Sequence, residues 1–72
     1  MLRIEKKRFS DGAGNAVVDI QVSTAAELPA LGETIGYSMK VKAGSTAQII
    51  QTGVFATLDD DGKWYAGGSE VS

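Results

Sequence analysis

The sequence predicts an all-β fold, a small antiparallel meander or partly open barrel of about six short strands with one helical turn at residues 24–28. Two observations predict this class. Apolar and polar residues alternate with a period of two in several short segments, as they do in half-buried strands. Glycine with aspartate, asparagine or serine separates these segments and marks turns. At 72 residues the chain has room for a single β domain, 1–72.

The first expected strand covers residues 2–9 and forms a basic N-terminal arm, residues 1–9. Leu2 and Ile4 lie on one face of it, and Arg3, Glu5 and Lys7 lie on the other. Its charge is typical of an edge strand, where charged side chains discourage pairing with another chain. The basic residues of this arm are Arg3, Lys6, Lys7 and Arg8. They predict either a solvated strand face or a docking contact with an acidic surface.

A hairpin is expected to join this arm to the next strand. Residues 10–15, SDGAGN, are turn formers, because glycine, aspartate and asparagine tolerate positive φ angles. The strand at residues 16–22 alternates without interruption. Its expected core-facing residues are Ala16, Val18, Ile20 and Val22.

The helical turn at residues 24–28 is predicted from a capping box. Thr24 is followed three residues later by Glu27, so the hydroxyl and the carboxylate can each satisfy a free backbone N–H. Pro29 ends the turn, because the residue before a proline is pushed out of the helical region.

The remaining strands are predicted at residues 35–41, 46–51, 54–58 and 63–66. In the first of these, Ile35, Tyr37, Met39 and Val41 are expected to share a face. Residues 67–72 are predicted to be a C-terminal tail that is flexible or held by a partner.

The chain has little bulk with which to build a core. Nine of its apolar residues are alanines, and it has no cysteine with which to form a disulfide. Other chains are the remaining source of stability, so the sequence predicts a homo-oligomer or a multi-copy lattice.

The net charge of −2 argues against nucleic acid as a partner. No apolar run approaches the roughly 18 residues of a membrane helix, and no signal peptide is recognised. We therefore expect a protein without a membrane partner, made in a cytoplasm.

Asp59, Asp60 and Asp61 precede Gly62 and are the densest group of possible site residues. If Gly62 is aligned with the glycine of an EF-hand loop, Thr57 and Gly68 fall at ligand positions that they cannot fill. Asp-Gly between two apolar runs is instead a strong hairpin signal. A turn is expected and no metal site, although a contact between subunits through these carboxylates stays open.

Enzymatic chemistry is not expected, and neither is a cofactor. The chain has no histidine and no cysteine, so the commonest proton shuttle and the strongest nucleophile are both missing. Trp64 and Tyr65 are adjacent on one strand and therefore point to opposite faces. Trp64 is expected in the core with Tyr65 at the surface, and the alternative makes the outward ring an anchor for a partner.

Three segments in order, VSTAAELPAL, KAGSTAQII and TGVFATLDDDGKWY, resemble a pattern of small tailed-bacteriophage virion proteins, including head-fibre and decoration-type proteins. The resemblance covers about residues 22–65. The matching residues are Ala26, Glu27, Leu28 and Pro29, then Gly44, Ser45 and Ala47, then Asp61, Gly62 and Trp64.

This resemblance implies a non-enzymatic structural subunit of a virion, made in the cytoplasm of a bacterial host and bound to the capsid or to other virion proteins. The basic arm has no counterpart in the pattern, and the long shaft of a fibre is missing, so a decoration or connector-like subunit fits better. The alternative is a free-standing small β-barrel module that binds peptide, glycan or nucleic acid. The expected interface residues are Leu2, Arg3, Ile4, Lys6, Lys7, Arg8, Trp64 and Tyr65.

Overall fold

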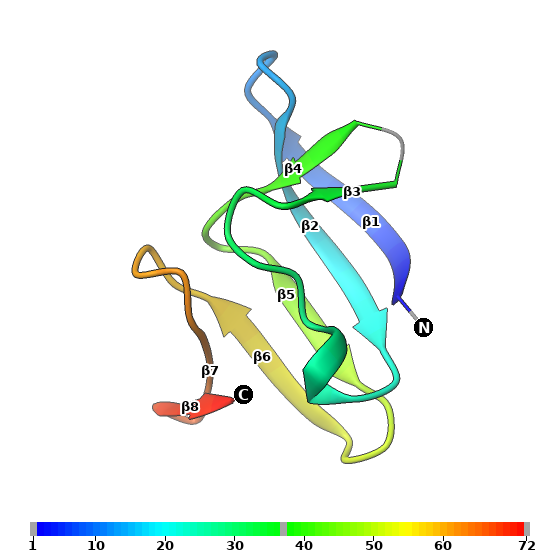
Figure 1. Ribbon diagram of the computed structural model, residues 1–72, viewed down its shortest axis with the longest axis vertical. Coiled ribbons are helices and arrows are strands. Elements are labelled where there is room, and N and C mark those ends of the chain that lie inside the picture. Colours follow the sequence, from blue (N-terminus) through cyan, green and yellow to red (C-terminus); the bar gives the residue numbers. More distant parts are fainter. Residues whose placement is uncertain (1, 37, 72) are drawn as a thin grey trace.

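The computed structural model describes residues 2–36 and 38–71, and within them the chain forms eight strands and one short 3-10 helix (Figure 1). The elements are β1 (Leu2–Ser10), β2 (Asn15–Val22), η1 (Ala25–Glu27), β3 (Thr34–Ile35), β4 (Met39–Val41), β5 (Thr46–Ile49), β6 (Val54–Leu58), β7 (Trp64–Ala66) and β8 (Ser69–Val71). The all-β class is therefore confirmed.

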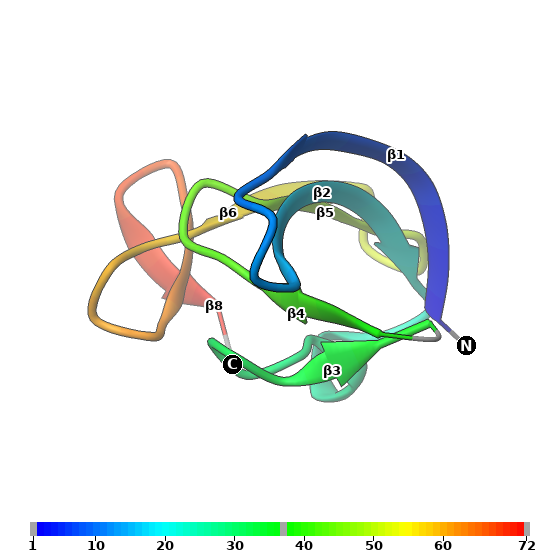
Figure 2. The same cartoon turned by 90° about the horizontal axis from the view of Figure 1, so that it is seen from above.

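All eight strands belong to one sheet, which curls around the core without closing into a barrel (Figure 2). Strand β2 is antiparallel to β1 on one side and parallel to both β4 and β5 on the other. The sheet is mixed where a purely antiparallel meander was expected, because the segment containing η1 crosses over before the chain re-enters the sheet. The antiparallel meander describes only β5 to β8.

One edge of β2 changes partner halfway along. β4 pairs with β2 at Asn15 and Ala16, and β5 pairs with it only from Asp19 onward. At the gap, the backbone N–H of Val18 donates to the hydroxyl of Ser45 over 3.1 Å, and that hydroxyl donates to the carbonyl of Lys42 over 2.7 Å. Ser45 is fully buried. Its side chain thus replaces the backbone hydrogen bond that β2 lacks between its pairing with β4 and its pairing with β5, since a buried N–H must find an acceptor.

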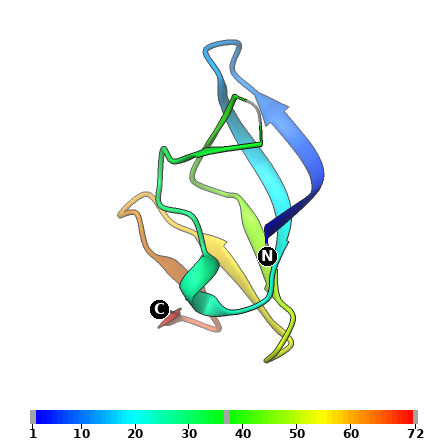
Figure 3. The same cartoon turned by 45° about the vertical axis from the view of Figure 1, so that its right-hand side comes forward.

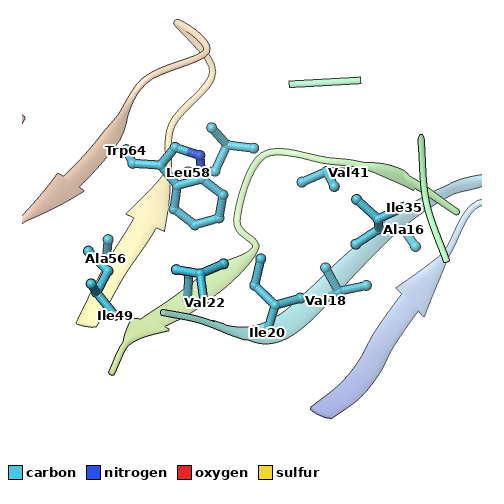
Figure 4. Packing of buried hydrophobic residues seen from close by; sticks show 11 residues of the cluster. Ala16, Val18, Ile20, Val22, Ile35, Val41, Ile49, Ala56, Leu58 and Trp64 are labelled. Carbon is cyan, nitrogen blue, oxygen red and sulfur yellow. The ribbon is translucent and has the colours of Figure 1, made fainter. Parts of the chain in front are cut away.

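The core is built from the inward side chains of β2, β5 and β6, closed by side chains from β3, β4 and β7 (Figure 4). Its members are Ala16, Val18, Ile20, Val22, Ile35, Val41, Ala47, Ile49, Ala56, Leu58 and Trp64. The alternation predicted for residues 16–22 is confirmed, with every second residue buried.

The segment that contains η1 covers the core on the side away from β5 (Figures 2 and 3). The predicted capping box is present, and the Glu27 carboxylate accepts the backbone N–H groups of Ser23 at 2.8 Å and Thr24 at 3.2 Å. Leu28 packs against the core, and the carbonyl of buried Pro29 accepts the indole N–H of Trp64 at 2.8 Å. This hydrogen bond holds the segment that contains η1 to the sheet.

Two predicted segments are wrong in detail. The strand expected at residues 35–41 is broken into β3 and β4, which pair with each other, because Gly36 adopts a positive φ of 61°. Tyr37, predicted to share a face with its neighbours, lies outside the described residues.

The tail expected at residues 67–72 contains β8. Gly67 and Gly68 have φ angles of 60° and 85°, and two such residues in a row make the tight turn that suits a hairpin. β8 consequently pairs with β7.

The simple alternation predicted for the arm also fails beyond Ile4. The register of β1 against β2 shifts between Ile4 and Lys6 and again between Lys7 and Phe9, as at β-bulges. Lys6 is therefore opposite Asp19, whereas Lys7 is opposite Val18, the reverse of the expected faces.

Candidate functional site

The candidate site is the face of the sheet that points away from the core, which we call the outer face. It is formed by the residues of β2, β5 and β6 that alternate with the core residues, together with part of β1. Its central side chains are Asp19, Gln21, Thr46, Gln48, Phe55 and Thr57. The four polar residues of β2 and β5 are only half-buried, because they cover one another.

Two rows of hydrogen-bonded side chains cross this face from β1 to β5. In the first row, the Arg8 Nε donates to Asp19 Oδ1 at 2.8 Å, and the Thr46 hydroxyl donates to the same oxygen at 2.6 Å. Arg8 also donates through Nη2 to the carbonyl of Gly44 at 2.7 Å. Arg8 thus joins β1 both to β2 and to the turn that precedes β5.

The second row is built on paired amides. Arg3 Nη2 donates to Gln21 Oε1 at 2.6 Å, and Gln21 Nε2 donates to Gln48 Oε1 at 2.9 Å. Glu5 is the last member of this row on β1, where its carboxylate forms an ion pair with Arg3 Nε at 2.8 Å. Rows of this kind fix side chains that would otherwise move freely, so the outer face is ordered before it meets any ligand.

Phe55 is the one large apolar side chain among the central residues of this face. It pairs with Gln48 across the strands and is 68% exposed. Beside it is a shallow hollow of about 300 Å³, whose lining includes Glu5, Asp19 and Gln48. An exposed aromatic ring next to ordered amide groups is the composition of a contact surface.

A second exposed ring lies at the end of β1. Phe9 is 52% exposed and pairs with Val17. The ammonium of Lys42 lies 5.5 Å from the centre of its ring, a cation–π contact.

The predicted interface residues fall into three groups. Leu2 and Ile4 are half-buried and pack against the core, and the basic residues are exposed on β1. Trp64 is 5% exposed and belongs to the core, so of its two expected placements the structure has the core one. Tyr65 is half-buried, on the same strand but on the opposite face.

The acidic segment forms the predicted turn between β6 and β7. The N–H of Asp59 donates to the carbonyl of Lys63, and Gly62 adopts a φ of 84°. Asp61 accepts the Tyr65 hydroxyl at 2.7 Å and the N–H of Lys63 at 2.9 Å. These bonds to Tyr65 and Lys63 lower the pKa of Asp61, and the bond to Asp61 raises the pKa of Tyr65 to about 12.

No group of three or more potential metal ligands is found in the part of the chain that the structure describes. Within those same residues, no helix has the length and apolar character needed to cross a membrane. A second hollow, of about 270 Å³, lies between the segment that contains η1 and the β7–β8 hairpin, and its lining includes Pro29, Trp64 and Val71.

Sequence reasoning missed Phe55 and the two polar rows. The signal was present, because alternation in residues 54–58 puts Phe55 on the face opposite Ala56 and Leu58. The partners within the rows could not be read, because they depend on the parallel pairing of β2 with β5 and on the bulges of β1.

Comparison of the chain with protein-family models, with curated proteins and with solved structures gave no match.

Proposed function

We propose that this chain is a non-enzymatic structural subunit of a bacteriophage particle, of the decoration or connector-like kind, that docks on a larger virion protein through its outer face. The observation that carries the proposal is the exposed Phe55 at the centre of a hydrogen-bonded polar face. The assignment to a virion is supported by the resemblance over residues 22–65.

The chemistry of the outer face suits adhesion to another protein. Hot spots of protein interfaces are enriched in aromatic residues and arginine, surrounded by polar groups that exclude water. Here Phe55 would be the anchor, while Arg3 and Arg8 are already held in place by Gln21 and Asp19. Docking a surface whose side chains are already fixed costs less conformational entropy than docking a mobile one.

The basic arm adds long-range attraction. Lys6 and Lys7 are exposed and make no ion pair with any described residue, so their charges act on a partner rather than within the chain. Such charges speed the approach of an acidic surface more than they strengthen the final complex.

The test is to purify phage particles from a host that encodes the chain and to measure the chain in them by mass spectrometry. The chain is expected to remain with the particles through a density gradient, in many copies per particle. The Phe55→Gln variant is expected to be made and folded but lost from the particles, whereas Leu31→Gln, the same kind of exchange at an exposed apolar residue outside the outer face, is expected to be retained. Wild-type chain found only in the free protein fractions would contradict the proposal.

One observation favours the alternative of a free-standing binding module. The hollow beside Phe55, at about 300 Å³, is at the lower limit of the size of small-ligand sites. A module of this kind would bind a peptide or glycan as an isolated monomer. Binding of immobilised glycans or peptides by purified chain, abolished in Phe55→Gln, would support that alternative.

A further inference from the structure

We propose that copies of this chain associate head to tail, with the basic edge strand β1 of one copy against the acidic end of the next copy. We define the acidic end as the β6–β7 turn, β7, the β7–β8 turn and β8, residues 59–71. The inference deepens the structural role proposed above, because it names a second copy of the chain as one of its partners.

The two surfaces are separate edges of the sheet, β1 beside β2 and β8 at the end of the strand order. Within residues 2–36 and 38–71, strand β1 pairs only with β2 and β8 pairs only with β7, so each has an outer edge with no described strand beside it. Figures 1 and 2 show β1 on one side of the molecule and β8 on the other. A surface at one end of a molecule that fits a surface at the other end produces a ring or a filament, rather than a closed pair.

Charge is separated between these ends. Strand β1 has four basic residues and one acidic residue, a net charge of +3. The acidic end has four acidic residues and one basic residue, a net charge of −3. The ends of two copies therefore attract each other, whereas two β1 edges or two acidic ends repel.

Some of the charges at each of these two surfaces are exposed and stay unpaired within one copy, among the described residues. On β1, Arg3 and Arg8 pair with Glu5 and Asp19, which leaves Lys6 and Lys7 without an ion pair among the described residues.

At the other end, Lys63 lies 3.9 Å from Glu70, and Asp61 is bonded to Tyr65. The carboxylates of Asp59 and Asp60 accept no hydrogen bond and form no ion pair within the described part of the chain. Each end thus presents two uncompensated charges of one sign.

The backbone geometry of β1 and β8 indicates that two copies meet through side chains and not by pairing strands. The two register shifts in β1 interrupt its edge, and β8 has only three residues, so neither is a good template for adding a strand. Complementary charge is then what determines how the copies align. A single exposed ion pair contributes little, so the association is expected to be weak, to need all four charges and to increase where copies are crowded on a particle.

The experiment exchanges the charges of the two ends. One variant combines Lys6→Glu with Lys7→Glu, and the other combines Asp59→Lys with Asp60→Lys. Wild-type chain is expected to self-associate at low ionic strength in sedimentation velocity measurements, and to dissociate at high ionic strength because salt screens exposed charges. Each variant alone is expected to associate at least about tenfold more weakly.

An equimolar mixture of the two variants is expected to regain association, because each reversed end then meets its complement. This recovery also shows that both variants are folded. Single Lys6→Glu is expected to weaken association as well, by less than the double variant does. Lys40→Glu, a reversal on β4 away from both ends, is its matched control, since each single substitution changes the net charge equally; it is expected to leave association unchanged.

Wild-type chain that stays monomeric at every concentration and ionic strength would overturn the inference. So would a mixture that associates no better than its components, which would mean that the basic edge binds some other acidic surface. Neither result would affect the particle measurement that tests the proposed function, so the two can fail separately.

Discussion

The two faces of β2, β5 and β6 share one backbone but differ in what holds their side chains. On the inner face, Val18, Ile49 and Leu58 are almost completely buried and belong to the hydrophobic core. On the outer face, Gln21 and Gln48 are fixed by hydrogen bonds and Phe55 is left exposed. Stability therefore depends on the inner face, while the outer face is available for contacts. Substitutions on the inner face should mainly lower stability, and substitutions on the outer face should mainly weaken binding.

The largest expected loss of stability comes from the inner face, at Trp64. Replacing it with alanine removes the largest core side chain and the N–H that the Pro29 carbonyl accepts. Large-to-small changes of this kind cost about 3–5 kcal/mol. Since folded domains are stable by only about 0.05–0.15 kcal/mol per residue, Trp64→Ala is expected to be largely unfolded or close to it. Urea denaturation followed by circular dichroism measures this.

Trp64→Phe is the control for the hydrogen bond between the Trp64 indole and the Pro29 carbonyl. It keeps most of the apolar volume but leaves the buried carbonyl of Pro29 without its donor, which costs about 1–3 kcal/mol. A Trp64→Ala protein as stable as wild type would show that the inner face does not hold the fold together.

A smaller loss is expected at Ser45, and its neighbour Thr46 makes the comparison between faces direct. Ser45→Ala leaves the buried N–H of Val18 without an acceptor, at a cost of about 1–3 kcal/mol. Thr46→Val removes a hydroxyl from the outer face, where water can replace it beside Asp19, so a change within about 1 kcal/mol is expected. Paired urea denaturation curves test the difference. Equal losses of stability in Ser45→Ala and Thr46→Val would contradict the role of the Ser45 hydroxyl as the acceptor that replaces a backbone hydrogen bond of the sheet.

The bond between Tyr65 and Asp61 is expected to make stability depend on pH at both extremes. Folding raises the pKa of Tyr65 from 10.0 to about 12, so its contribution is complete below pH 10.0 and is lost as the pH rises through about 12. Folding lowers the pKa of Asp61 below 3.8, so its contribution is complete above pH 3.8 and is lost as the pH falls through the lowered value.

Tyr65→Phe should abolish the alkaline part of this dependence, and it should also lower stability slightly near neutral pH, where the contribution of the exposed bond to Asp61 is complete in wild-type chain. Absorbance titration of wild-type chain should show a tyrosine that ionises late, at about pH 12, and the variant should lack it. A late tyrosine that persists in Tyr65→Phe would show that the hydrogen bond to Asp61 is not the cause.

Much of the fold was predictable from local sequence. Alternation identified β2 and its buried face, and the capping box of Thr24 and Glu27 located η1. Asp61 and Gly62 marked the turn before Trp64. Each of these features is determined by residues that are close together in the sequence, so a local sequence pattern is enough to predict it.

What could not be predicted depends on distant partners. The parallel pairing of β2 with β5 joins residues 27 apart, and the role of Ser45 exists only because β2 changes partner there. The bulges of β1 reversed the faces of Lys6 and Lys7, and no local pattern announces them. The Gly67 and Gly68 turn is different, since two successive glycines between short strands are a hairpin signal that was overlooked.

The smallest expected effect on stability is at Phe55, although its expected effect on binding is the largest of any outer-face residue. Phe55→Gln replaces a ring that is 68% exposed, so the free energy of unfolding should change by no more than about 0.5 kcal/mol. Ala56, its neighbour, is the matched control on the inner face: Ala56→Leu forces extra volume into a filled core and should cost about 1–3 kcal/mol. Thermal unfolding of both variants compares them directly. If Phe55→Gln destabilised the chain as much as Ala56→Leu, Phe55 would be a structural residue, and the outer face would lose the anchor on which the proposed docking depends.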